Sequence, residues 1–271
     1  MSDDVDARRQ FGAELKSHRE LYGETGMTQT ELARKCKTSK STISRLEATA
    51  GRIPPEIPAL LDQVFATDGL FQRLYEQIVA EGFSVYSRKR IELEPKAAAI
   101  VEWSPTVVPG LLQTAGYAYA LLQEGMPRAT EPEVQRKVQQ RLHRQELLRG
   151  PTPPDLSVVI CESVVRRTVG GPEVMRGQLK ALLEIASRRT TILQVLPLNA
   201  EYPHRLMDGS LSIVTTHDRL VVAYTEGIQS GSIIEDPGQV RALERSYDVL
   251  TASALSRDAS ARMIRSTMEA L

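Results

Sequence analysis

The sequence contains few of the residues that metal sites and disulfide scaffolds require, and it lacks long apolar runs. Two cysteines, Cys36 and Cys161, and four histidines are spread over 271 residues. Neither residue type shows the close spacing of a zinc site, so we expect no metal. We also expect no cofactor. Two scattered cysteines are typical of reduced, buried thiols in a cytoplasmic protein. No apolar run approaches the roughly 18 to 20 residues that span a bilayer, and the N-terminus lacks the apolar core of a secretory signal. We therefore expect no membrane association.

The chain as a whole also lacks net charge, with 34 basic and 34 acidic residues. The segment 28–52 departs from this balance, because only Glu31 and Glu47 oppose its basic residues. Those basic residues are Arg34, Lys35, Lys37, Lys40, Arg45 and Arg52. A basic face confined to one segment is typical of phosphate contacts made by a single module. Charged residues that merely solvate a helix face give the same pattern, so charge alone leaves both interpretations open.

The same segment predicts two short helices joined by a tight turn. Thr28 followed by Glu31 forms a capping box at the start of the first helix, and Ser39 can cap the second. Ile43 and Leu46 supply the inner face of the second helix. A helix-turn-helix of this length places its second helix in the DNA major groove. The outward side chains of that helix can bond to base edges or phosphates: Lys40, Ser41, Ser44 and Arg45.

Residues 8–65 resemble the XRE-type, phage-repressor-like helix-turn-helix family. The resemblance rests on FGAELKSHREL, the Thr-Gln pair at 28–29, the Leu-Ala that follows, and Ser-Arg-Leu-Glu at 44–47. It implies that Gln29 binds a phosphate from a helix N-terminus, and that Arg19 pairs with Glu47. The implied DNA-contacting residues are Thr28, Gln29, Lys40, Ser41, Thr42, Ser44 and Arg45.

Two features depart from that family's pattern. The link YGETGM between the first two helices is about three residues longer than usual. The resemblance therefore implies the Arg19–Glu47 pair less strongly than it implies the recognition helix. Lysine occupies position 40, where the family often has glutamine. Lysine favours guanine or phosphate over adenine, so the preferred bases are expected to differ.

Length and patterning predict an α+β protein with two domains. An N-terminal all-α helix-turn-helix domain over 1–67 is followed by a helical connector over 68–101 and a mixed α/β C-terminal domain over 102–271. Beyond the helix-turn-helix, helices are predicted at 56–65, 68–82, 131–149, 172–188, 236–254 and 256–270. Strands are predicted at 155–167, 190–198, 209–217 and 219–227, the last two as a hairpin.

A series of short motifs follows in order over residues 97–271. They include Glu102, VVPGLLQTAGYA at 107–118, RLHRQELL at 141–148, Glu162, VLP at 195–197, Gly-Ser-Leu at 209–211 and Tyr-Thr-Glu at 224–226. Together they resemble a C-terminal domain of unknown function found in several actinobacterial XRE-type regulators. The resemblance implies an antitoxin-like transcriptional regulator, commonly paired with a small partner protein encoded nearby.

Polar residues within these motifs form a candidate ligand- or partner-binding site. They are Glu102, Gln113, Tyr117, Arg141, Arg144, Gln145 and Glu162. A concave apolar groove with a few polar groups would use them as its lining. Alternatively, the VPGLLQT segment is turn and core packing. In that case Arg141 and Arg144, which share a helix face, form buried ion pairs with Glu102 or Glu162.

The sequence thus predicts a homodimeric, sequence-specific regulator that binds double-stranded DNA. Its C-terminal domain would bind a small partner protein or a small-molecule ligand and so modulate operator binding. The alternative is an antitoxin-like protein whose main role is binding a small cognate partner. An enzyme is not expected, since the sequence has no P-loop, no Gly-x-Ser-x-Gly and no His-Glu-x-x-His.

Overall fold

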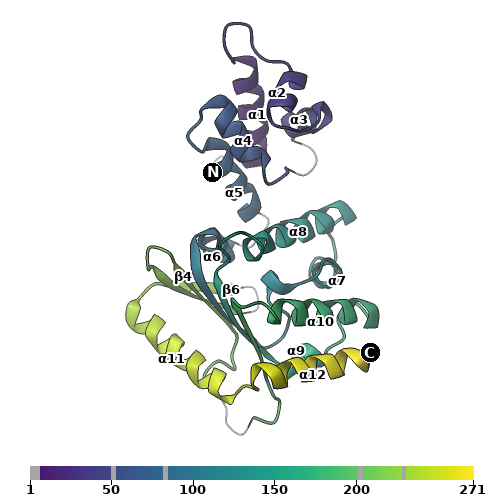
Figure 1. Ribbon diagram of the computed structural model, residues 1–271, viewed down its shortest axis with the longest axis vertical. Helices are drawn as coiled ribbons and strands as arrows, with labels where there is room; N and C mark the ends of the chain where they lie inside the picture. The colour runs from purple at the N-terminus through teal and green to yellow at the C-terminus, as the bar shows by residue number, and fades with distance from the viewer. Residues whose placement is uncertain (1–6, 50–52, 82–84, 201–203, 228–229) are drawn as a thin grey trace. The chain divides into compact units, whose positions relative to one another are not determined.

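The computed structural model describes residues 7–49, 53–81, 85–200, 204–227 and 230–271, and the chain divides into two units, Met1–Ser84 and Val85–Leu271 (Figure 1). The first unit is helical and the second contains a mixed sheet with helices, which confirms the α+β class. None of the described helices is long and apolar enough to cross a membrane.

The described part of the first unit folds as helices around one apolar core. These are α1 (Ala7–Glu20), α2 (Gln29–Lys35), α3 (Lys40–Glu47), α4 (Ile57–Phe65) and α5 (Leu70–Glu81). Phe11 of α1 packs edge-on against Phe71 of α5, with ring centres 5.4 Å apart. Gly12 lets α1 approach α3 closely, because a Cβ there would lie 3.0 Å from the carbonyl oxygen of Leu46. Helix α5 thus completes the core on which α1 and α3 rest.

Asp62 at the inner side of α4 fixes the start of α5. Its side chain is buried and accepts hydrogen bonds from the backbone N–H groups of Phe71 at 2.9 Å and Gln72 at 3.0 Å. The Thr67 hydroxyl donates a further bond at 2.6 Å. Burial alone would raise the pKa of Asp62, but the hydrogen bonds from Thr67, Phe71 and Gln72 lower it overall. The ionised carboxylate therefore satisfies donors that the first turn of α5 leaves free.

Asp62→Ala should speed amide exchange in α5 about 30-fold at neutral pH, since hydrogen bonds to a charged group contribute about 2 kcal/mol. Hydrogen–deuterium exchange on the full chain measures this, and Asp68→Asn, at an exposed acid nearby, should leave exchange unchanged.

A carboxylate with a lowered folded pKa stabilises above its unfolded pKa of about 4 and loses that effect as pH falls through the folded value. The difference between wild type and Asp62→Ala should therefore shrink below about pH 4. An Asp62→Ala exchange rate equal to that of wild type would contradict the capping role.

The strands of the second unit form one sheet in the order β3-β2-β1-β4-β5-β6. Their bounds are β1 (Ala97–Ser104), β2 (Asp155–Cys161), β3 (Thr191–Leu196), β4 (Ser210–Thr216), β5 (Val221–Gly227) and β6 (Ser230–Ile234). Strands β1, β2 and β3 pair in parallel, whereas β1–β4, β4–β5 and β5–β6 pair antiparallel. The predicted β4–β5 hairpin is confirmed, and β1 joins the parallel and antiparallel halves.

Helices cover both faces of this sheet (Figure 1). They are α6 (Val85–Leu93), α7 (Ala115–Gly125), α8 (Glu131–Arg144), α9 (Glu162–Arg166), α10 (Pro172–Ala186), α11 (Pro237–Ser253) and α12 (Arg257–Glu269). Short 3₁₀ turns are η1 (Glu94–Lys96), η2 (Gly110–Leu112) and η3 (Gln145–Leu148). Ile100 of β1 packs in the core shared with α10 and α12, whereas Trp103 packs in the core shared with α11. The alternation of a strand thus serves two separate cores.

The structure differs from the predicted helical connector over 68–101. Helix α5 belongs to the core of the first unit, while α6, η1 and the first residues of β1 belong to the second. Residues 97–99 are alanines, which favour helix locally, but β2 and β4 offer hydrogen-bonding partners on both edges of this segment. Tertiary pairing therefore overrides local propensity. The predicted strand over 155–167 ends at Cys161, because α9 begins at Glu162, and β6 lies where the sequence predicts no strand.

Both cysteines lie in the described part of the chain and neither forms a disulfide. Cys36 is buried, as expected, whereas Cys161 is only half-buried.

Candidate functional site

Two side-chain caps set the geometry of α2 and α3. The Thr28 hydroxyl accepts from the backbone N–H of Glu31 at 3.2 Å, and the Glu31 carboxylate accepts from the backbone N–H of Thr28 at 2.7 Å. At the start of α3, Ser39 Oγ accepts from the backbone N–H of Thr42 at 3.1 Å. Both predicted caps are confirmed. Between the helices, Lys37 adopts a left-handed conformation with φ 50°, which closes the turn.

Helix α3 presents one apolar and one polar face. Ile43 and Leu46 are buried in the core of the first unit. The side chains on the other face are exposed, as predicted: Lys40, Ser41, Ser44 and Arg45. The Arg45 Nε donates to the carbonyl oxygen of Ser41 at 3.3 Å, which holds its guanidinium along the exposed face. An exposed helix with these donors and acceptors meets the requirements of a recognition helix in a major groove.

A buried network braces α3 against α1 and α2. Arg19 donates two hydrogen bonds to the Glu47 carboxylate, from Nε at 2.5 Å and from Nη2 at 3.1 Å, and these raise the pKa of Arg19. The pair implied by the family resemblance is thereby confirmed. Arg19 also donates to the carbonyl oxygen of Met27 at 2.9 Å, so the long α1–α2 link folds back onto the pair. Bidentate arginine–carboxylate geometry of this kind holds the angle between helices.

Two other predicted DNA-contacting residues take part in bonds within the unit. The Gln29 amide nitrogen donates to Glu47 Oε2 at 2.8 Å, which adds α2 to the brace. Thr42 is half-buried, and its hydroxyl lies 2.8 Å from the Ser39 hydroxyl. Their contacts with DNA, like that of the Thr28 side chain, stay predictions. Arg34, Lys35 and Lys37 are exposed beside the turn, whereas Arg52 lies outside the described residues.

In the second unit, four charged residues form a buried cluster. Arg144 of α8 binds Glu94 of η1 with two hydrogen bonds, at 2.8 and 2.5 Å. Arg90 of α6 bridges Glu94, at 3.1 Å, and Glu102 of β1. The side chains of Glu94 and Arg144 are only 3% and 7% exposed. The sequence interpretation pairs Arg144 with Glu102 or Glu162, but in the structure Arg144 binds Glu94, because η1 brings Glu94 beside α8.

Three buried glutamines and a tyrosine hold the VPGLLQT segment in place. Gln113 Nε2 donates to Val108 O at 2.7 Å, and Gln145 Nε2 donates to Gln113 O at 2.5 Å. Gln178 of α10 donates to Leu112 O at 2.8 Å and accepts from the Thr114 N–H at 2.7 Å. The Tyr117 hydroxyl accepts from the Val108 N–H at 3.1 Å. These contacts favour the structural interpretation of Gln113, Tyr117 and Gln145, since buried backbone groups need such partners.

The remaining two predicted residues lie in different surroundings. Arg141 donates to Gln113 Oε1 at 2.7 Å, and burial together with the nearby Arg144 lowers the pKa of Arg141 to about 10. Glu162 at the start of α9 pairs with Arg166 at 2.5 Å and accepts from the Leu198 N–H at 2.9 Å. The seven predicted residues therefore do not line one shared groove. Sequence reasoning missed Arg90, Glu94 and Gln178, although the four-residue spacing of Arg90 and Glu94 is a usable signal for an ion pair.

Comparison with known families agrees with this division of the chain. Residues 10–71 match a family model described as a helix-turn-helix domain, which supports a DNA-binding regulator. Residues 87–266 match a model described as a domain of unknown function (DUF5753). No curated protein and no solved structure matches the chain. Because the second match covers more than half of the sequence, the chain belongs to the DUF5753 domain family, and it joins that domain to an N-terminal helix-turn-helix.

Proposed function

We propose that this protein is a transcriptional regulator, not an enzyme, that reads double-stranded DNA by inserting α3 into the major groove. The observation that supports this most strongly is the exposed polar face of α3 above a fixed framework. Ser39 caps the helix, and the Arg19–Glu47–Gln29 network holds its angle. Rigid placement matters, because each base contact depends on side-chain positions set by the helix as a whole.

Homodimerisation is part of the proposal. One α3 covers only a few base pairs, and helix-turn-helix proteins gain specificity by binding two half-sites about one helical turn apart. A symmetric dimer would then bind a palindromic or nearly palindromic operator. The DUF5753 domain would bind an effector, either a small partner protein or a small molecule, and its occupancy would alter operator affinity. An antitoxin-like role is compatible with this scheme if the partner is a small protein encoded nearby.

The proposal is tested by measuring binding of the full chain to DNA upstream of its own gene, with a scrambled duplex as control. Fluorescence anisotropy at roughly 50 and 200 mM salt should show at least about a thousandfold preference for the upstream duplex. Affinity for both duplexes should fall with salt, because phosphate contacts release counterions. Equal affinity for the two duplexes would contradict sequence-specific recognition at this site.

A further inference from the structure

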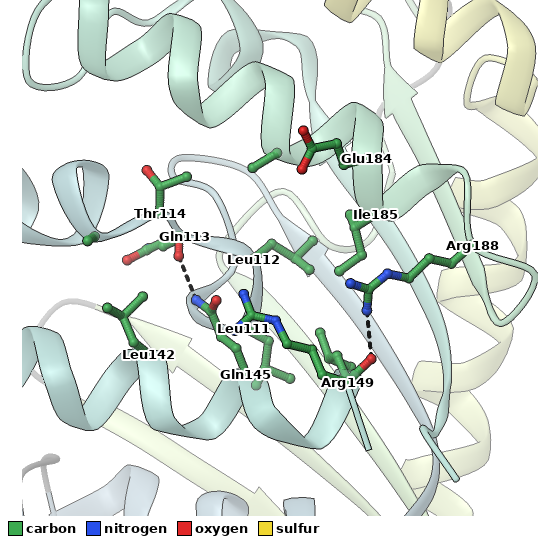
Figure 2. Close-up of a pocket in the computed structure, with 13 residues that line it drawn as sticks. Leu111, Leu112, Gln113, Thr114, Leu142, Gln145, Arg149, Glu184, Ile185 and Arg188 are labelled. Carbon is green, nitrogen blue, oxygen red and sulfur yellow. Dashed lines mark hydrogen bonds between the residues drawn. The ribbon is translucent and has the colours of Figure 1, made fainter. Parts of the chain in front are cut away.

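A cavity in the second unit lies among η2, the start of α7, the end of α8 with η3, and the end of α10 (Figure 2). Its volume is about 300 Å³, which is the lower end of the range for small-molecule sites. The apolar part of its lining consists of Leu111, Leu112, Ala115, Leu142, Leu148, Ala181 and Ile185. These apolar side chains suit a short hydrocarbon body.

The charged groups at this cavity are unequal in sign. Arg149 and Arg188 both reach it, and Glu184 borders it on the side away from the two guanidinium groups (Figure 2). Arg188 donates to the carbonyl oxygen of Leu148 at 2.6 Å, which holds it at the end of η3. Among the described residues, no carboxylate lies within ion-pair distance of Arg149 or Arg188. Two arginines at one cavity can together bind a single carboxylate.

We propose that this cavity binds a small amphiphilic carboxylate, with its apolar body on the leucine-lined floor and its carboxylate between Arg149 and Arg188. The inference deepens the proposed function by naming the ligand class of the DUF5753 domain, and its regulatory consequence rests on that function. The occupant would contact Gln113 and Gln145, the glutamines that tie η2 to α8. Binding would therefore act on the same hydrogen bonds that position α8.

The test uses the full chain and octanoate as the probe, with 1-octanol and octylamine as neutral and cationic controls. Isothermal titration should show saturable octanoate binding, with both controls binding at least tenfold more weakly. No DNA is present, so failure of this test leaves the proposed DNA binding intact, and failure of DNA binding leaves this test valid. Absence of saturation with millimolar octanoate, or equal affinity for octylamine, would overturn the proposal.

Four variants then locate the site. Arg149→Gln with Arg188→Gln should raise the Kd for octanoate at least tenfold, whereas Arg189→Gln, at an exposed neighbour outside the cavity, should leave it unchanged. Glu184→Gln should lower the Kd, because it removes a repelling charge. Ala181→Leu should block binding by filling the cavity. Unaltered fluorescence of buried Trp103 shows that each variant is folded. This location would be refuted if the folded Arg149→Gln/Arg188→Gln and Ala181→Leu proteins both bound octanoate as tightly as wild type.

Discussion

Replacing Lys40 and Arg45 together with alanine should weaken binding to the specific DNA duplex by at least about 30-fold. Each arginine or lysine contact with a base edge or phosphate contributes about 1 to 3 kcal/mol, so losing two gives a factor of this size. Both side chains are exposed and neither supports the core. The thermal unfolding temperature should therefore stay within about 2 °C of the wild-type value. Fluorescence anisotropy at one fixed salt concentration measures the change in affinity.

The matched control removes two positive charges elsewhere in the same unit. Arg9 and Lys16 are exposed residues of α1, and neither belongs to α3 or its brace. The Arg9→Ala/Lys16→Ala protein should bind the specific duplex within about fivefold of wild type, since only long-range attraction is reduced. If both double variants lost affinity equally for specific and scrambled DNA, general basic charge and not the face of α3 would explain binding.

Glu94→Ala should lower the free energy of unfolding of the second unit by about 3 to 5 kcal/mol. The carboxylate is 3% exposed and is shared by Arg144 and Arg90. Its removal takes away the bidentate partner of Arg144 and leaves one carboxylate, Glu102, against two largely buried guanidinium groups. Breaking a buried pair from one side costs this much. The single tryptophan, Trp103, is buried in the second unit, so its fluorescence in urea reports the unfolding of that unit alone.

Two further variants separate the ion pair from the general effect of substitution. Glu92→Ala, at an exposed acid of α6, should change stability by less than about 0.5 kcal/mol. Glu94→Leu with Arg144→Met removes both partners of the bidentate pair and leaves Arg90 bound to Glu102. This double variant should recover at least about half of the loss, because no charge of that pair stays buried alone. A double variant less stable than Glu94→Ala would show that the attraction within the pair itself dominates, and not the cost of a buried charge that has lost its partner.

The helix-turn-helix could be predicted in detail because its determinants are local. The Thr28–Glu31 capping box and the Ser39 cap each act within four residues, and the apolar positions of α3 follow helical spacing. Even the Arg19–Glu47 pair, far apart in sequence, was predictable from the family resemblance. The buried positions Ile43 and Leu46 and the exposed positions Lys40, Ser41, Ser44 and Arg45 are confirmed, whereas Thr42 is half-buried.

The C-terminal polar residues were harder to interpret, because their partners come from distant elements. Glu94 lies in a turn that the sequence assigned to a connector, yet it decides where Arg144 points. Gln178 lies 64 residues from Thr114, and it accepts a hydrogen bond from the Thr114 backbone N–H. Strand β1 depends on β2 and β4 for its existence, and its alanines resemble a helix when they are considered alone. Residue type and spacing do not encode such long-range pairing.

The most direct test of the account is selection of binding sites from a random pool of DNA duplexes by the 271-residue chain. The account predicts enrichment of one sequence with two related half-sites about one helical turn apart, and no enrichment by the folded Lys40→Ala/Arg45→Ala protein. Enrichment of the same sequence by both proteins would contradict reading of DNA by α3. Failure of the wild-type protein to enrich any sequence would contradict sequence-specific recognition itself.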